Sequence, residues 1–175
     1  QSQIFFACYG DPGLYAAKEI CDCPVLGIAE TSIAMSFLLG NRFSILAASE
    51  KAVPMMEHMV AQYGMDHRLA GVFPLNMSVL DAEANRGETV SRLIEEGKKA
   101  VSKGAEVLIL GCAGMTGFGG PVSQALGIPV MDPVETSFLT LEMMCRGGFK
   151  TSKNGLYKPP GKKRIKREYL LTENI

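Results

Sequence analysis

The sequence has no net charge and no long apolar run. Lys plus Arg and Asp plus Glu both number 18 in 175 residues, so no overall field attracts nucleic acid or an acidic membrane. No stretch approaches the roughly 18 apolar residues that a membrane helix needs, and the first residues lack the basic and apolar regions of a signal peptide. We therefore expect a cytoplasmic protein with no nucleic-acid and no membrane partner, whose function lies in a local pocket.

The sequence also lacks the usual motifs of metal and cofactor sites. Cys21 and Cys23 have one residue between them, and no C-x-x-C pair or histidine-rich segment accompanies them. No dinucleotide fingerprint or pyridoxal phosphate lysine motif is visible. The five cysteines are an odd number, which favours reduced thiols over a disulfide framework. The sequence thus predicts a site with no metal and no cofactor.

Histidine is scarce, and most of the cysteines have no special setting. His58 falls on a helical pattern and His67 in a polar loop, so we interpret both as exposed structural residues. Free cysteine usually behaves as a small hydrophobic residue. We interpret Cys21, Cys23 and Cys145 in this way.

The chain does contain a regular alternation of strand-like and helix-like segments. Short apolar runs predict strands at 1–8, 25–29, 43–48, 72–75, 107–110 and 130–131. Helical spacing or turn signals predict helices at 14–21, 31–39, 51–63, 88–103, 119–126 and 136–146, with a loop over 76–87. This order is typical of α/β proteins, in which helices flank a parallel sheet.

One pattern occurs twice. Residues 4–32 and 108–137 each contain an apolar strand, a cysteine, a Gly/Pro turn, a second strand that begins with Pro-Val, and the sequence E-T-S. From Cys8 to Pro24 is 16 residues and from Cys112 to Pro129 is 17. A duplicated unit of this kind predicts two pseudo-symmetric lobes, with one cysteine on each side of a cleft.

The lobes have predicted boundaries. We expect residues 1–40 and 131–150 to form the first lobe, 41–130 the second, and 151–175 a basic C-terminal tail that wraps a neighbouring surface. A βαβ unit takes about 30 residues or more, so we expect the first lobe to lack its N-terminal part. A nucleic-acid arm is a less favoured interpretation of the tail, because no aromatic residues are interleaved to stack on bases.

The two repeated cysteines are the candidate catalytic residues. Cys8 and Cys112 each follow a predicted strand, and ligands of α/β sheets bind outside the carboxyl ends of strands. Gly10 and Gly114 follow within two residues, so backbone N–H groups can approach a carbonyl oxygen. A thiol can act as base or acid, and inversion at a carbon next to a carbonyl needs one of each on opposite faces. The pair therefore predicts a racemase.

Other polar residues near these turns have two interpretations each. Ser49 follows the predicted strand 43–48 and can hold a substrate amide or cap a helix. Asp11 can support the site or start the helix after it. Glu30 and Glu135 can support the site or serve the dipole of a helix whose Thr and Ser residues cap it.

The motifs resemble those of the Asp/Glu racemase superfamily, and within it the hydantoin racemase group. The resemblance rests on A-C-Y-G-D-P-G-L at 7–14, P-V-L-G-I-A-E at 24–30, L-G-C-A-G-M at 110–115, G-I-P-V-M-D-P-V at 127–134 and T-S-K-N-G-L-Y-K-P-P at 151–160. It spans nearly the whole chain. It implies two pseudo-symmetric α/β lobes and a metal-free, cofactor-free racemisation in which Cys8 and Cys112 are the two bases.

The resemblance also implies a substrate class. Amino-acid racemases of the superfamily carry C-N-T and G-C-T-H at the two cysteines, whereas Tyr9, Gly10, Ala113 and Gly114 follow the thiols here. These residues are the predicted substrate contacts, and they favour a 5-substituted hydantoin or allantoin. The alternatives are an aspartate or glutamate racemase or related isomerase, and a non-catalytic small-molecule binding protein. We also expect a homo-oligomer.

Overall fold

The described residues form two parallel sheets. The computed structural model describes residues 2–161, so 162–175 of the predicted tail lie outside it. A two-stranded sheet pairs β1 (Ile4–Phe6) with β2 (Val25–Gly27), and a four-stranded sheet has the order β4 (Leu69–Pro74), β3 (Phe43–Ala47), β5 (Val107–Leu110), β6 (Val130–Met131). All the pairings are parallel, which confirms the predicted α/β class.

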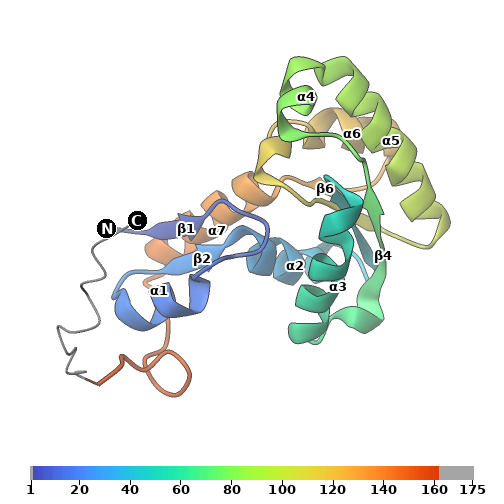
Figure 1. Ribbon diagram of the computed structural model, residues 1–175. Coiled ribbons are helices and arrows are strands. Elements are labelled where there is room, and N and C mark those ends of the chain that lie inside the picture. Colours follow the sequence, from blue (N-terminus) through green and yellow to red (C-terminus); the bar gives the residue numbers. More distant parts are fainter. Residues whose placement is uncertain (1, 162–175) are drawn as a thin grey trace, which may run out of the picture.

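Two helices connect the sheets. The helices are α1 (Leu14–Ile20), α2 (Ile28–Leu39), α3 (Val53–Gln62), α4 (Val79–Ala84), α5 (Arg86–Ser102), α6 (Gly119–Leu126) and α7 (Pro133–Arg146). α2 and α7 pack against each other, and we call them the interlobe helices (Figure 1). α7 contacts β1 and β2 of the two-stranded sheet, and α2 contacts β2 as well as β5 of the four-stranded sheet, so α2 links the two sheets directly. The exact lobe boundaries stay a prediction.

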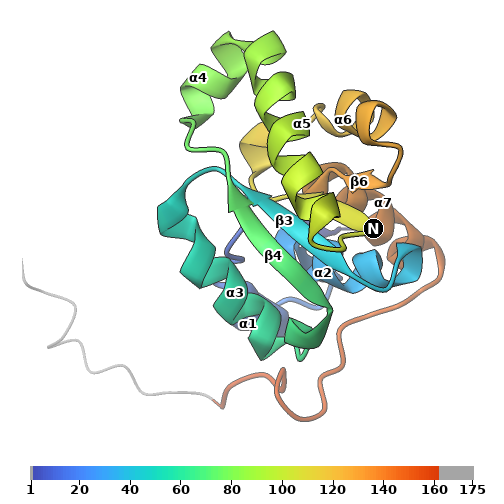
Figure 2. The same cartoon turned by 90° about the vertical axis from the view of Figure 1, so that its right-hand side faces the viewer.

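The four-stranded sheet is covered on both faces. Ile33 of α2 and Met56 of α3 pack with Ile45 on one face, and Leu93 of α5 packs with Leu108 on the other. Figure 2 shows α5 and α6 on one side of this sheet and α2 and α3 on the other. Every residue of β3 and β5 is buried, as expected for inner strands of a parallel sheet.

The sequence repeat reappears in the strand pairing. Ile4, four residues before the first cysteine, pairs with Val25; Leu108, four residues before the second, pairs with Val130. The N–H of Ile4 donates to the carbonyl oxygen of Pro24 at 3.1 Å, and that of Leu108 to Pro129 at 3.0 Å. The two units therefore have the same register.

Some predicted element bounds were wrong. The segment 76–87, expected as a loop, contains α4, which Ser78 caps by accepting the N–H of Asp81 at 3.1 Å. Only Ala82 of α4 is buried, so the sequence shows no apolar periodicity there. The strand expected at 72–75 begins at residue 69 and is longer.

Both interlobe helices begin three residues earlier than expected, at Ile28 and Pro133. The E-T-S residues therefore lie beyond the N-cap, and the prediction that their hydroxyls cap the helices was wrong. Thr31 donates instead to the carbonyl oxygen of Gly27, and Ser137 to that of Pro133, both at 2.7 Å.

The close contact of β5 with β3 predicts the effect of a single methyl group. A Cβ at Gly111 would lie 2.8 Å from the carbonyl oxygen of Leu46, and a backbone atom cannot give way. We expect Gly111→Ala to lower the free energy of unfolding by about 1–3 kcal/mol, measured by urea denaturation. Gly120→Ala is the control, because a Cβ there meets no described atom within 4 Å, and we expect it to be neutral or stabilising by about 0.4–1 kcal/mol. Equal effects of the two substitutions would contradict this account.

Candidate functional site

The carboxyl edge of the four-stranded sheet has a topological switch point. β3 and β5 are neighbours, but the chain continues from β3 to β4 on one side and from β5 to β6 on the other. A crevice forms where such connections diverge, and it is the usual ligand site of open α/β sheets. Ser49 follows β3 and Cys112 follows β5, so both lie at this edge.

Cys112 begins a tight turn, residues 112–115, which we call the second cysteine turn. Its side chain is partly exposed, and its sulfur accepts the N–H of Gly114 at 3.4 Å. Gly114 packs directly on Val79 of α4, so that a Cβ there would collide with the valine. The turn therefore requires glycine two residues after the thiol.

Cys8 begins the first cysteine turn, residues 8–11, just after β1. Its thiol is exposed, and its carbonyl oxygen accepts the N–H groups of Gly10 at 2.9 Å and Asp11 at 3.0 Å. The turn leaves Asp11 with φ 44°, in the left-handed region. Of the next two residues, Tyr9 is buried and Gly10 is partly exposed.

The chain at the two cysteines approaches the same turn of α3. A Cβ at Gly10, within the first cysteine turn, would lie 3.6 Å from the sulfur of Met55, and one at Gly111, directly before the second, would lie 3.0 Å from Cε of Met56. Tyr9 belongs to a hydrophobic cluster against which Ala113 packs. The fold thus brings the first cysteine turn and the residue before the second to the beginning of α3.

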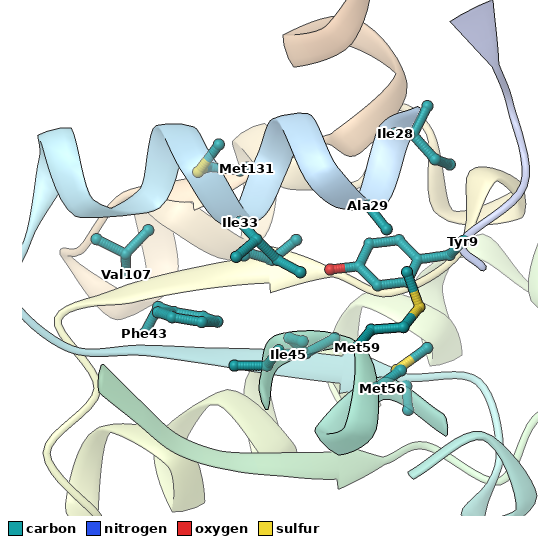
Figure 3. Close-up of a cluster of buried hydrophobic side chains, with 13 residues drawn as sticks. Tyr9, Ile28, Ala29, Ile33, Phe43, Ile45, Met56, Met59, Val107 and Met131 are labelled. Atoms are coloured by element: carbon teal, nitrogen blue, oxygen red, sulfur yellow. The ribbon is translucent and has the colours of Figure 1, made fainter. Parts of the chain in front are cut away.

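Tyr9 has its side chain in the core. It is 6% exposed and lies among Ala29, Met56 and Met59, as Figure 3 shows. Burial raises the pKa of the phenol above its ordinary value, and its hydroxyl has no hydrogen-bond partner among the described residues. Only the backbone of Tyr9 is therefore placed for the substrate contact that the sequence predicts.

Asp11 caps the interlobe helix α2, and the expectation that it starts α1 was wrong. Its carboxylate accepts the N–H of Ala29 at 3.1 Å and that of Glu30 at 2.8 Å. The N-cap of α1 is Gly13, in the left-handed region at φ 78°. A Cβ at Gly27 would overlap the carboxyl group of Asp11, so glycine at that position makes room for the contact.

Glu30 links α2 to α1. Its carboxylate accepts two bonds from the Lys18 ammonium, at 2.6 and 2.7 Å, in a partly buried ion pair. It also accepts the N–H of Gly27 at 3.3 Å, as the third helical residue does in a capping box, while Asp11 accepts the N–H of Glu30 in place of an N-cap side chain. These contacts support the helix-capping interpretation of Glu30.

The segment after α7 returns to the same helix. The Lys153 ammonium donates to the last carbonyl groups of α1, those of Lys18 at 2.5 Å, Glu19 at 3.1 Å and Cys21 at 2.7 Å. A cation in this position satisfies carbonyl groups that have no partner within the helix. The Lys18 ammonium also lies 5.3 Å from the ring centroid of Tyr157. α1 is thereby held between α2 and the C-terminal segment.

Asp132 is a site residue that the sequence analysis missed. As N-cap of α7 it accepts the N–H groups of Val134 at 3.0 Å and Glu135 at 3.2 Å. Its other oxygen accepts the N–H of Gly117 at 2.8 Å, beyond the second cysteine turn. Asp followed by Pro just before a helical pattern is a recognised start signal and could have found it.

The other predicted site residues have simpler settings. Glu135 is exposed in the first turn of α7. Ser49 is partly buried at the N-cap of a 3-10 turn, and within the described part of the chain its side chain makes no capping bond. His58 and His67 are exposed, as expected.

Metal-site and membrane features were also searched in residues 2–161. This range contains no group of three or more His, Cys, Asp or Glu side chains that could hold a metal ion. No helix in it combines the length and the apolar character needed to span a membrane. The cytoplasmic location and the homo-oligomer stay predictions.

Comparisons with known proteins show the family of this chain. The family model for Asp/Glu/Hydantoin racemase matches residues 2–139. The chain belongs to this family. Hydantoin racemases from Pseudomonas sp. (strain NS671) and Paenarthrobacter aurescens are 42% and 39% identical to it, and each match covers 90% of this chain. The chain spans 64% of the length of the first and 67% of the second.

Solved structures of the family show the same fold. Allantoin racemase from Pseudomonas fluorescens matches with a TM-score of 0.89 at 29% identity, over 94% of this chain and 70% of that one. Allantoin racemase from Klebsiella pneumoniae matches with a TM-score of 0.87 at 32% identity, over 94% and 67%. A glutamate racemase from Bacillus anthracis, at 15% identity and a TM-score of 0.61, shares the fold alone.

In this member of the racemase family, the charge of Asp11 gives a pH-dependent stability. Burial raises its pKa above the ordinary 3.8, and the N–H groups of Glu30 and Ala29 only partly oppose this. The folded protein therefore holds the Asp11 proton to a higher pH than the unfolded chain does. The resulting stability is fully present below pH 3.8 and is lost as the pH rises through the raised pKa.

We expect the stability of the wild type relative to Asp11→Asn to fall with rising pH in this window. Urea unfolding of both proteins between about pH 3 and pH 7 measures the difference. The variant removes the Asp11 titration and also one of the two acceptor oxygens, and because the second loss does not depend on pH, the change of the difference with pH is the readout. A difference that grows with pH would show instead that the two N–H bonds outweigh the cost of burial.

Proposed function

We propose that the protein is a cofactor-independent racemase of a 5-substituted hydantoin or allantoin, with Cys8 and Cys112 as the two bases. The observation that carries the proposal is the equivalence of the two thiols. Each follows the first strand of a strand pair, and the two pairs have the same register, Ile4 with Val25 and Leu108 with Val130. Gly10 in the first turn and Gly111, directly before the second, also border the first turn of α3.

The proposed reaction is a 1,1-proton transfer. A thiolate on one face of the ring removes the proton from C5 and becomes a thiol, while the electrons of the C–H bond move onto the adjacent carbonyl oxygen as an enolate. The thiol on the other face then donates its proton to C5 and becomes a thiolate. The configuration at C5 is then inverted, and the two cysteines have exchanged protonation states.

Backbone N–H groups stabilise the enolate in this proposal. Oriented donors are most effective where negative charge develops in a site with little water. The residues after each thiol, Gly10 and Gly114, allow the backbone to approach the ring closely, and Tyr9 and Ala113 contribute backbone rather than side-chain contacts. We assign an amide of the ring to the Ser49 hydroxyl, because Ser49 follows β3 at its carboxyl end.

The substrate class is supported by the turns and by the relatives. Tyr9 follows Cys8 with its hydroxyl buried in the core, and Ala113 follows Cys112, so neither thiol is followed directly by an exposed hydroxyl or an imidazole, which a site for an α-carboxylate would use. The similar proteins are named hydantoin racemase and allantoin racemase. A ring with two imide carbonyls matches a site of backbone N–H donors.

Replacement of either thiol tests the proposal. We expect Cys8→Ser and Cys112→Ser each to lower kcat/KM for racemisation of a 5-alkylhydantoin by about 10²–10⁴-fold, because a hydroxyl is a much weaker acid and base than a thiol. Polarimetry or circular dichroism measures the rate. Cys23→Ser is the matched control and should retain the wild-type rate, since Cys23 lies before β2 and away from both turns.

Solvent deuterium separates the alternatives. In D2O the wild type should place deuterium at C5 of the inverted product, and each single variant should exchange only one enantiomer without inversion. Full racemisation by either variant would exclude the two-thiol mechanism. Racemisation of aspartate or glutamate but not of hydantoins would indicate the amino-acid branch. Thermal stabilisation by ligand without exchange would indicate a binding protein.

A further inference from the structure

The two interlobe helices begin on carboxylates that come from different places in the chain. α7 has its own N-cap side chain, Asp132. The N-cap of α2 is Gly27, which has no side chain, and the carboxylate on its first turn comes from Asp11, 16 residues earlier. Both carboxylates accept two backbone N–H groups of the helix that they cap.

The two carboxylates occupy equivalent positions in space. Gly27 and Asp132 are the same position of the repeat, each three residues after the proline that begins the second strand. A Cβ built on Gly27 would lie 2.1–2.4 Å from the three carboxyl atoms of Asp11, which are its nearest neighbours. The Asp11 carboxyl group therefore occupies space that a side chain at position 27 would need.

Each carboxylate also connects its helix to a cysteine turn. Asp11 is itself the last residue of the first cysteine turn, three positions after Cys8. Asp132 reaches the segment that follows the second turn, where it accepts the N–H of Gly117 at 2.8 Å. An aspartate thus connects a helix N-terminus with the chain at or just after each cysteine turn: Asp11 is part of the turn and reaches the helix, whereas Asp132 is part of the helix cap and reaches the chain after the turn.

The backbone conformation and the buried charge of Asp11 are both unfavourable for the folded state. The residue adopts φ 44°, and burial of its carboxylate disfavours the charged form. The nearby Glu30 also disfavours that charge, and Lys18 only partly compensates. Strain and a disfavoured charge at one residue are typical of functional sites and are not explained by stability alone.

We propose that Asp11 and Asp132 are a matched pair of positioning residues, each of which aligns one of the two thiols: Asp11 aligns Cys8, and Asp132 aligns Cys112. This rests on the proposed function, in which each thiol serves one face of the ring. Each aspartate is therefore expected to affect proton transfer at one face of the ring only. Loss of Asp11 impairs proton transfer at the Cys8 face and spares the other face.

Half-reactions in thiol variants show this directly. In Cys112→Ser only the Cys8 face can exchange the C5 hydrogen with D2O, and in Cys8→Ser only the Cys112 face can. We expect Asp11→Ala to slow exchange by about 10- to 100-fold in the Cys112→Ser protein, and by less than about twofold in the Cys8→Ser protein. Asp132→Ala should show the reverse pattern. Equal losses in both backgrounds would overturn the proposal.

A transplanted carboxylate gives the sharper test. In the double variant Asp11→Ala with Gly27→Asp, the carboxylate is supplied from the helix side, as Asp132 supplies it in the other lobe. We expect the double variant to regain at least about a third of the exchange rate lost in Asp11→Ala, with Gly27→Ala in place of Gly27→Asp as the control that does not restore it. Failure to restore exchange in a double variant that unfolds at the wild-type temperature would overturn the proposal.

Alkylation provides a readout that does not depend on racemase activity. The rates at which iodoacetamide modifies Cys8 and Cys112, followed by mass spectrometry, should change at Cys8 alone in Asp11→Ala and return to the wild-type value in the double variant. An unchanged Cys8 rate would overturn the positioning role even if exchange were slower. A sided change in alkylation with no racemisation by the wild type would leave the positioning role intact and reject the proposed function.

Discussion

The site depends on how the first turns of α2 and α7 obtain hydrogen-bond acceptors. The first N–H groups of a helix have no partner within it, and both of these helix ends are packed inside the protein. A carboxylate from Asp11 or Asp132 supplies the acceptor in each case. Asp11 belongs to the first cysteine turn, and Asp132 accepts the N–H of Gly117 just beyond the second, so in our proposal each carboxylate also positions a thiol relative to its helix.

The interlobe helices transmit this constraint across the molecule. α2 and α7 pack against each other, and α7 covers the small sheet while α2 reaches β5 of the large one. The relative placement of the two cysteine turns therefore follows from one helix pair. Around Cys8 the arrangement is reinforced by the ion pair of Lys18 with Glu30 and by Lys153 on the end of α1. Around Cys112 the buried strands of the large sheet serve the same purpose.

Sequence patterns predicted the elements whose signals are local. β5 at Val107–Leu110 and α6 at Gly119–Leu126 have the predicted bounds, since an apolar run and flanking glycines mark them. α4 was missed because a helix with one buried residue has no apolar period. The strand predicted at 25–29 was too long, because Ile28 and Ala29 continue an apolar run that nothing nearby interrupts. The helix begins at Ile28, and the carboxylate that accepts an N–H of its first turn belongs to Asp11, 18 positions before Ala29.

The sequence by itself determined the repeat, the two cysteines with their glycines, and the family, because these depend on residue identity and spacing along the chain. The tertiary structure alone decided that Asp11 caps α2, that the Tyr9 side chain lies in the core, and that Glu30 pairs with Lys18. Each of these is a contact between elements that fold together from separate parts of the chain. A hydrogen bond or a buried ring depends on distance in space, and sequence periodicity carries information only about neighbours within one element.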